Sequence, residues 1–524
     1  MLTEDQADVI EFLAAPVTHD TATVDRIDTH SAIVFLAGQR AYKLKRAVRF
    51  DYLDFSTVER RHAMCEAELR LNRRTAPDIY RRVVPVTREP DGTLVLGGCG
   101  AAVDWIVEMN RFSQEALFDR LAAAGRLDLE LMPALAAEIA GFHRLAEPRP
   151  DRGGRRGMEW VIEGNAAGFA EYGEGVLDSP SHRRLTEASR AALAARGALV
   201  DERRASGFVR HCHGDLHLRN IVLLDGRPTL FDGVEFNDEI ACIDVLYDLA
   251  FLLMDLWRRG LPQHGNAVWN RYLDDAGDLS GTSLVPLFLS CRAAVRAKTS
   301  ATAARLQPDV RRRNELQTLA REYLEMAERL LQPPGPCLVA IGGFSGTGKS
   351  TLARSLAPSV GSAPGAVVIR SDLIRKRLSG VWPLDRLGPQ GYAPEMSERV
   401  YTAVAERARM AILEGHSAIV DAVCARPGDR SAIERVAAAA AVPFVGIWLD
   451  APETTLITRV EQRRHDASDA DAAVIRLQHR EGAGEIRWHR VEANRPLDDV
   501  RDDVSKYVHA SVRRAPHIAP DRTS

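Results

Sequence analysis

At 524 residues the chain exceeds what one hydrophobic core usually organises, so we expect more than one domain. Its formal net charge of -3 excludes the strongly basic character of a nucleic-acid-binding protein, and its apolar runs are too short to cross a membrane. Seven scattered cysteines without a C-x-x-C pair exclude a disulfide framework, and the acidic N-terminus is unlike a signal peptide, so we predict a cytoplasmic protein.

The first distinctive element is a predicted β-hairpin, "SAIVFLAGQRAYKLK", at residues 31–45. Two apolar strands flank a turn that contains Gly38. Side chains alternate along a strand, so Ala41, Lys43 and Lys45 lie on one face of the second strand. The hairpin is therefore expected to present its lysines on a single face of a sheet.

A helix is predicted next, over "STVERRHAMCEAELRLNRR". Ser56 and Glu59 have the spacing of a capping box, which predicts that the helix begins there. Helical spacing places Cys65 and Glu68 on one face and directs Glu66 away from it. Glu68 is therefore expected to point inward.

A polar stretch, "HCHGDLHLRN" at residues 211–220, interrupts two apolar runs. Asp215 and Asn220 stand five apart behind His213, which is the spacing of the kinase catalytic loop H-R-D-x-x-x-x-N. In that loop the aspartate accepts the proton of the acceptor hydroxyl and the asparagine binds Mg²⁺. His213 and His217, four apart, can instead be interpreted as metal ligands, although the stretch has the pattern of a loop.

A second predicted hairpin, "IVLLDGRPTLFDG", follows directly, with Asp-Gly as its two-residue turn. It returns Asp232 to the side of Asn220, in the place of the Mg²⁺-binding aspartate of D-F-G, although the order here is Phe-Asp-Gly. The kinase template then assigns the α- and β-phosphates of ATP to Lys43, with Lys45 as the alternative. It assigns Glu68 as the ion-pair partner of that lysine.

The segments "HGDLHLRN" and "LFDG" resemble the aminoglycoside phosphotransferase and choline kinase family, over about residues 20–330. The resemblance implies an α+β, bilobal protein-kinase-like fold in which His217 replaces a residue of the protein kinase loop. It also implies that Asp244 or Asp248, in "DVLYDLAFLL", braces the catalytic segment. No G-x-G-x-x-G precedes the first hairpin, so the turn at Thr29 to Ser31 is expected to cover the phosphates.

The clearest boundary is the Pro-Pro-Gly-Pro run of residues 333–336, which ends an amphipathic helix and enforces an extended link. We predict a kinase domain over residues 1–332, this linker, and a second domain over residues 337–512. The polar, proline-containing residues 513–524 are predicted to form a disordered tail.

Directly after the linker, "CLVAIGG" predicts a buried parallel strand, and "GFSGTGKST" matches the phosphate-binding template G-x-x-x-x-G-K-[ST] before a helix. Backbone amides of such a loop point at phosphate oxygens. Lys349 would reach the β- and γ-phosphates, and the Ser350 hydroxyl would bind Mg²⁺. The predicted nucleotide-binding residues are Gly343, Ser345, Gly346, Thr347, Gly348, Lys349, Ser350 and Thr351.

Two carboxylates follow predicted strands of the same sheet. The run "AVVIRSDLIRKRL" turns from strand to helix at Ser371 and Asp372, so Asp372 is expected beside the phosphates, where it could orient and deprotonate an acceptor hydroxyl. The alternative role for Asp372 is a helix cap. "HSAIVDAV" predicts a third strand that ends at Asp421, which could hold a magnesium-bound water or the acceptor.

After a fourth predicted strand, "PFVGIWLD", Arg459 and Arg463 stand four apart, hence on one helix face, with Arg464 adjacent. They could close over ATP and neutralise the transferring phosphoryl group, or form a solvated basic face. This half resembles small P-loop kinases of the gluconate kinase and zeta toxin type over about residues 336–512. The resemblance implies an α/β fold with a parallel sheet, and an arginine-bearing lid after the fourth strand.

Both halves together are similar to a bacterial family described as bifunctional aminoglycoside phosphotransferase and ATP-binding proteins. We therefore predict two phosphotransferase sites that use ATP and Mg²⁺, each acting on a hydroxyl of a small molecule, with neither nucleic acid nor membrane as partner. A basic excess in "DSPSHRRLTEASRAALAARGALVDERR" argues against polycationic aminoglycosides as acceptors.

Three alternatives stay open: a regulatory N-terminal half that binds nucleotide without turnover, a polynucleotide 5'-hydroxyl kinase in the C-terminal half, and a serine/threonine protein kinase, for which no A-P-E element follows Asp232 within the N-terminal half. The acceptors and the oligomeric state are not set by these motifs.

Overall fold

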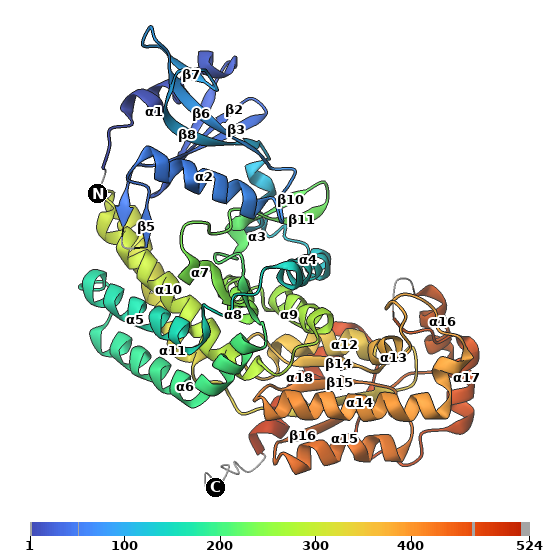
Figure 1. Ribbon diagram of the computed structural model, residues 1–524. Helices are drawn as coiled ribbons and strands as arrows, with labels where there is room; N and C mark the ends of the chain where they lie inside the picture. Colours follow the sequence, from blue (N-terminus) through green and yellow to red (C-terminus); the bar gives the residue numbers. More distant parts are fainter. Residues whose placement is uncertain (1–2, 51, 464–466, 515–524) are drawn as a thin grey trace. The chain divides into compact units, whose positions relative to one another are not determined.

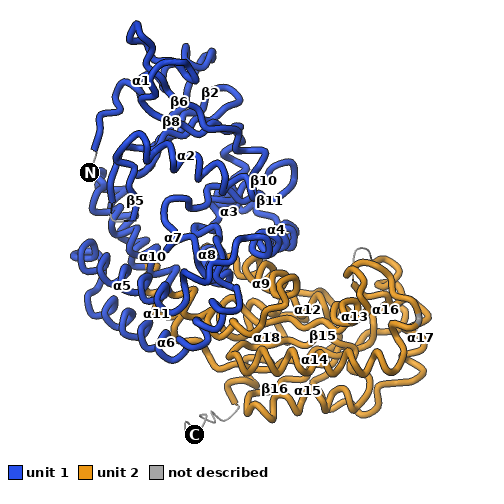
Figure 2. Tube along the Cα trace, in the orientation of Figure 1, with its two compact units in different colours: residues 1–255, 291–321 blue, residues 256–290, 322–524 orange. Residues whose placement is uncertain are grey.

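The computed structural model describes residues 3–50, 52–463 and 467–514 (Figure 1). The chain divides into two compact units (Figure 2). Unit 1 comprises residues 1–255 and 291–321, and unit 2 comprises residues 256–290 and 322–524. Residues 256–290 thus belong to unit 2 although they precede the Pro-Pro-Gly-Pro run, and the domain limits given above stay a prediction.

The C-terminal helix α18 (Leu497–Arg514) includes the first two residues of the predicted disordered tail. The remainder of that tail, residues 515–524, lies outside the described residues. Across the part of the chain that is described, none of the helices is both long enough and apolar enough to span a bilayer.

Unit 1 begins with a six-stranded sheet in which all neighbouring strands are antiparallel. In spatial order its strands are β1 (Val24–Asp28), β2 (Ala32–Ala37), β3 (Arg40–Lys45), β8 (Ala101–Asn110), β6 (Tyr80–Arg88) and β7 (Leu94–Leu96). Alternation along β2 and β3 sends Phe35 and Leu44 to the face covered by helix α1 (Ala7–Ala14), and Leu36 and Ala41 to the other face, which helix α2 (Val58–Asn72) covers. The pairing of β2 with β3 confirms the predicted first hairpin.

Helix α2 begins one residue later than the capping box predicted. Its N-cap is Thr57, whose hydroxyl accepts a hydrogen bond from the Arg60 amide at 3.4 Å. Ser56 is not the cap because its hydroxyl donates to Asp54 Oδ1 at 2.5 Å. The inward direction of Glu68 is as expected, since Glu68 is buried and Glu66 is exposed.

The remainder of unit 1 is mainly helical, and with the sheet it confirms the predicted α+β, bilobal kinase-like fold. Its further elements are β4 (Arg49–Phe50), β5 (Leu53–Asp54), α3 (Phe118–Ala123), α4 (Met132–Leu145), α5 (Gly154–Tyr172), α6 (Ser179–Ala205), β9 (Val209–His211), β10 (Ile221–Leu224), β11 (Arg227–Leu230), α7 (Asp238–Ala241) and β12 (Cys242–Asp244). Helices α8 (Val245–Arg258), α10 (Val285–Leu306) and α11 (Val310–Leu330) contain residues of both units.

Two short antiparallel strand pairs frame the polar stretch of unit 1. β9 pairs with β12, and β10 pairs with β11. Asp225 and Gly226 join β10 to β11, and both have positive φ, as the predicted two-residue turn requires. The predicted second hairpin is therefore present.

Unit 2 contains a five-stranded parallel sheet, which confirms the predicted α/β fold of the C-terminal half. In spatial order its strands are β14 (Val367–Arg370), β15 (Ala418–Asp421), β13 (Leu338–Gly343), β16 (Phe444–Asp450) and β17 (His489–Glu492). Its further helices are α9 (Pro262–Ala276), α12 (Lys349–Leu356), α13 (Ser371–Leu378), α14 (Pro394–Leu413), α15 (Pro427–Ala439), α16 (Glu453–Gln462) and α17 (Ala472–Glu481).

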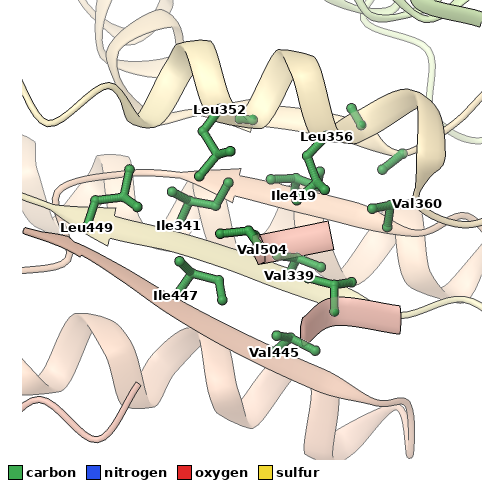
Figure 3. Close-up of a cluster of buried hydrophobic side chains, with 14 of the residues drawn as sticks. Val339, Ile341, Leu352, Leu356, Val360, Ile419, Val445, Ile447, Leu449 and Val504 are labelled. Carbon is green, nitrogen blue, oxygen red and sulfur yellow. The ribbon is translucent and has the colours of Figure 1, made fainter. Parts of the chain in front are cut away.

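The core of unit 2 places the loop between β13 and α12 firmly. Every residue of the central strand β13 is buried. Leu352 and Leu356 of α12 pack onto Ile341 and Ile419 of the sheet, and Val504 of α18 joins the same cluster (Figure 3). Both ends of the loop are therefore anchored in packed elements.

Helix α9 covers the outer edge of the sheet of unit 2. The Asn266 amide donates to the carbonyl oxygens of Pro364 at 2.9 Å and Ala366 at 3.2 Å. Asn270 Oδ1 accepts from the amide of Val368, in the edge strand β14, at 2.6 Å. These side chains satisfy backbone groups that an edge strand otherwise leaves unpaired.

Candidate active sites

In unit 1 a lysine and two carboxylates converge from three elements. Lys43 Nζ, on β3, donates to Glu68 Oε1 of α2 at 2.7 Å and to Asp232 Oδ1, just after β11, at 2.6 Å. Burial opposes the charge of Lys43, but Asp232 and Glu68 outweigh it and raise the pKa of Lys43 well above its ordinary value. The lysine is therefore held charged and in one position.

The second lysine of the strand, Lys45, is locked into the interior. Lys45 Nζ donates to Glu68 Oε2 at 2.7 Å and also to Glu235, a residue that the sequence patterns did not single out. Burial raises the pKa of Glu235. Glu68 is buried as well, yet Lys43 and Lys45 lower its pKa to about 2. Of the two lysines, Lys43 reaches Asp232 and is the one whose side chain is partly exposed.

The predicted catalytic loop brings Asp215 and Asn220 into contact. Asn220 Nδ2 donates to the backbone oxygen of Asp215 at 2.9 Å and to its Oδ2 at 3.0 Å. His217 Nε2 lies 3.3 Å from the same Oδ2. Burial acts against ionisation of Asp215, but His217 and other positive charges lower its pKa below the ordinary value. Asp215 is thus a fixed, ionised hydrogen-bond acceptor.

Asp248, and not Asp244, braces this loop. Its two carboxylate oxygens accept the backbone amides of His213 at 3.1 Å and Gly214 at 2.9 Å. Asp244 instead pairs with Arg203 at 2.7 Å. These hydrogen bonds identify Asp248 as the residue that braces the loop.

The histidines of the stretch have separate partners. His213 Nε2 lies 2.9 Å from the carbonyl oxygen of Phe231, whereas His217 faces Asp215. Within the described residues, the group of potential ligands that does come within metal-binding distance is His143, Cys212 and Asp248, which is buried. The alternative of a metal held between His213 and His217 receives no support from these contacts.

Asn220 and Asp232 offer amide and carboxylate oxygens, the donors that Mg²⁺ prefers. The hairpin brings their two segments together, because the amide of Phe231, the residue before Asp232, donates to the Asn220 carbonyl oxygen at 3.0 Å. The residues present therefore fit a magnesium ion.

The turn between β1 and β2 lies near these groups. The Thr29 hydroxyl accepts from the Ala32 amide at 2.9 Å, which closes the turn. Burial lowers the pKa of His30, at the tip, while the charges of Asp215 and Asp232 act in the opposite direction. The turn expected to cover the phosphates thus lies within electrostatic reach of both carboxylates.

In unit 2 the loop between β13 and α12 depends on its glycines. Gly343, Gly346 and Gly348 have φ of +137°, +86° and +91°, which side chains rarely adopt. A Cβ on Gly343 would lie 2.6 Å from the Leu449 carbonyl oxygen, and one on Gly346 would lie 2.8 Å from the Leu456 carbonyl oxygen. Only glycine fits both places without a shift of neighbouring backbone.

Polar side chains of the loop bond mainly to its own backbone. Lys349 Nζ donates to the Phe344 carbonyl oxygen at 3.0 Å, and the Thr347 hydroxyl donates to the same atom at 2.9 Å. The Ser345 amide donates to Gln478 Oε1 of α17 at 2.9 Å, a partner that no sequence motif indicated. Thr351, the last of the predicted nucleotide-binding residues, is exposed.

The carboxylates of unit 2 lie where the sequence placed them, at the carboxyl ends of β14 and β15. Asp372 lies in the first turn of α13 but is not its cap, because the N-cap is Arg370 and has no side-chain cap bond. Burial and the charge of Asp421 raise the pKa of Asp372. Burial also disfavours the charged form of Lys349 and therefore lowers its pKa.

Ser350 and Asp421 share one cationic partner. Arg370 Nη2 donates to Ser350 Oγ at 3.3 Å, and Arg370 Nε donates to Asp421 Oδ2, also at 3.3 Å. A hydroxyl and a carboxylate oxygen are hard donors that suit Mg²⁺. These two residues therefore fit the ion.

The two arginines of the expected lid do not share a helix face. Helix α16 ends at Gln462, and Arg463 follows as an extended C-cap, so the four-residue spacing is not helical throughout. Arg459 donates to the Ala493 carbonyl oxygen at 2.9 Å, whereas the charge of Arg463, after burial, helps to lower the pKa of Lys349. Arg464 lies outside the described residues.

Residues 109–281 match the family described as "Phosphotransferase enzyme family", and residues 338–482 match the family described as "AAA domain". An uncharacterised protein of Mycobacterium tuberculosis (strain ATCC 25618 / H37Rv) is 30% identical over 497 residues, 93% of this chain and 95% of that protein. The adenylyl-sulfate kinase of Myxococcus xanthus is 32% identical over 118 residues, 22% of this chain and 59% of that one. Among solved structures, a choline/ethanolamine kinase family protein from Mesorhizobium loti is 14% identical with a TM-score of 0.38, covering 63% of this chain and 95% of that one.

Proposed function

Since the chain belongs to the family of two-domain bacterial phosphotransferases that join a kinase domain of the phosphotransferase type to a P-loop kinase domain, we propose that it has two active sites. Each transfers the γ-phosphate of ATP to a hydroxyl of a small molecule. One observation carries the proposal: each unit has its own groups suited to phosphate, to Mg²⁺ and to an acceptor hydroxyl.

In unit 1 the mechanism rests on positioning. Lys43, held by Glu68, binds the α- and β-phosphates of ATP. Asn220 and Asp232 would hold Mg²⁺, which would neutralise charge on the phosphates. Asp215 accepts the hydrogen bond of the acceptor hydroxyl and orients its oxygen towards the γ-phosphate. Because the pKa of Asp215 is lowered, it takes the proton only as the new oxygen–phosphorus bond forms, the bond from the γ-phosphorus to ADP breaks and the hydroxyl becomes acidic; ADP is the leaving group.

In unit 2 the backbone amides from Gly343 to Thr351 receive the phosphates, and Lys349 moves from the Phe344 carbonyl to the β- and γ-phosphates. Ser350 and Asp421 would hold Mg²⁺, which would neutralise charge on the phosphates. Asp372 faces the acceptor, and its raised pKa suits proton transfer closer to neutral pH than is usual for a carboxylate. Arg463 adds positive charge beside the transferring group.

The test uses labelled ATP, purified protein and an extract of small metabolites. Asp215→Asn should remove one set of labelled products and Lys349→Ala a different set. Matched controls are Asp225→Asn, in the exposed β10–β11 turn, and Lys506→Ala, on the exposed side of α18; both should leave all products.

If Asp215→Asn leaves every product, unit 1 is not a catalyst, and a nucleotide-binding regulatory role replaces it. If labelled oligonucleotides appear when RNA or DNA is added, and disappear in Lys349→Ala, unit 2 is a polynucleotide kinase and not a small-molecule kinase.

A further inference from the structure

Arg370 occupies a position that no nucleotide-binding motif explains. It is the last residue of β14 and lies beside Asp421 in the register of the neighbouring strand β15. Its guanidinium donates to Asp421 Oδ2 and to Ser350 Oγ, both at 3.3 Å. One side chain therefore spans the two residues that the proposed function assigns to Mg²⁺.

The ion pair lies in the interior of unit 2. Only 12% of the Arg370 side chain and 5% of the Asp421 side chain are exposed. A buried carboxylate is costly without a cationic partner, so Asp421 needs a counter-charge whether or not nucleotide is bound. Arg370 supplies that charge when no nucleotide is bound.

A guanidinium and a magnesium ion cannot both hold the same carboxylate and hydroxyl oxygens at close range. Their positive charges repel, and a hard dication requires its oxygen ligands at much shorter distance than a hydrogen-bond donor. An ion that binds through Asp421 Oδ2 and Ser350 Oγ, the two oxygens to which Arg370 donates, therefore requires the guanidinium to leave at least one of them.

We infer that Arg370 and Mg²⁺ compete for the oxygens of Ser350 and Asp421, so that Arg370 is a positioning residue that sets the magnesium requirement of unit 2. The inference rests on the proposed function of unit 2. It goes beyond that proposal because it identifies Arg370 as the group that bonds to Ser350 and Asp421 when no nucleotide is bound. Arg370 keeps Asp421 neutralised and correctly placed until the magnesium–nucleotide complex arrives.

The experiment measures Mg²⁺ binding through a fluorescent ATP analogue. Full-length chains carry Asp232→Asn to suppress Mg²⁺ at unit 1, with or without Arg370→Met. Loss of a charge-assisted competitor should lower the Mg²⁺ concentration for half-maximal nucleotide binding by about tenfold. Arg377→Met, an exposed arginine of α13, is the matched control and should leave this concentration unchanged.

A second readout needs no nucleotide. Without Mg²⁺, Arg370→Met leaves Asp421 buried without its hydrogen-bonded cation, so the midpoint of thermal unfolding of the variant should fall. Added Mg²⁺ should raise the midpoint of the variant by more than it raises that of the parent chain. Arg370→Lys, which keeps one positive charge, should lie between the two in both measurements.

The inference is overturned if Arg370→Met leaves the half-maximal Mg²⁺ concentration unchanged or raises it while the parent chain binds nucleotide in a Mg²⁺-dependent way. If the parent chain itself shows no such binding, the proposed function of unit 2 fails, and the inference fails with it.

Discussion

In unit 1 the lysine assigned to ATP is paired with carboxylates before nucleotide binds, whereas in unit 2 the corresponding lysine donates to a backbone carbonyl oxygen. Lys43 has a raised pKa because two carboxylates face it, and Lys349 has a lowered pKa because burial dominates. The lysine of the first site is therefore held by side-chain ion pairs between distant segments, whereas the lysine of the second site is held by the backbone of its own loop.

The largest effect that tests this contrast is on catalysis in unit 2. Lys349→Met should lower kcat/KM of that site by about 10³-fold, because the lysine stabilises charge that develops on the transferring group. The free energy of unfolding should change little, since the Lys349 hydrogen bond is to a backbone carbonyl oxygen and Asp421 keeps its bond from Arg370. Steady-state kinetics with urea unfolding checks both; an equal loss of stability and activity would contradict the contrast.

A stability effect should dominate in unit 1. Glu68→Gln leaves Lys43 and Lys45 without their shared carboxylate partner, which should lower the free energy of unfolding by about 3 kcal/mol. Denaturant unfolding, followed alongside Glu66→Gln on the exposed side of α2, measures it. A similar result for both variants would show that the buried ion pairs contribute nothing specific.

Acid should separate the same ion pairs. The pKa of Glu68 falls from its ordinary value of 4.5 to about 2 on folding, so its stabilising contribution is complete above the ordinary value and is lost as the pH falls towards 2. Thermal unfolding of the native chain should therefore be more acid-sensitive than that of Glu68→Gln over this range. Parallel pH dependences would argue that Glu68 keeps an ordinary pKa.

The two bases should also differ in their pH–activity profiles. The pKa of Asp215 is lowered and that of Asp372 is raised, and each acts as a base only when ionised. As the pH falls, activity of unit 2 should be lost first, with the acidic limb of its profile at higher pH than that of unit 1. If the acidic limbs of the two profiles coincide, the two bases do not differ in pKa as expected.

The smallest effect concerns the edge of the sheet in unit 2. Asn266→Ala removes hydrogen bonds to the carbonyl oxygens of Pro364 and Ala366 and should destabilise unit 2 by about 1 kcal/mol. Scanning calorimetry measures the shift against Asn314→Ala, an exposed helical asparagine of α11. The activity of unit 1 at low temperature should be unchanged in both variants.

Motifs with short spacing allowed much of both sites to be predicted. Asp215 and Asn220, the Asp-Gly hairpin and the glycine-rich loop all depend on residues within one loop or turn, where backbone geometry follows from local sequence. Partners that meet across the chain left no such pattern. Lys45 and Glu235 lie 190 positions apart, and Ser345 and Gln478 lie 133 apart.

The sequence patterns also misplaced the ends of two helices. The residue that caps α2 was misplaced by one because Ser56 found a nearer partner in Asp54. The face assigned to Arg459 and Arg463 depended on a helix that stops at Gln462. Both differences arise from single hydrogen bonds and backbone angles that side-chain periodicity does not encode.

Helix α9 lies within the sequence that matches the phosphotransferase family, yet its asparagines complete the sheet of the P-loop unit. Gene recombination that cut the chain at the Pro-Pro-Gly-Pro run would separate β14 from helix α9. The exposed edge of β14 could then pair with strands of other chains and cause aggregation. The two halves are therefore expected to be inherited as one piece, because the P-loop unit needs residues 256–290, which lie within the first half of the chain.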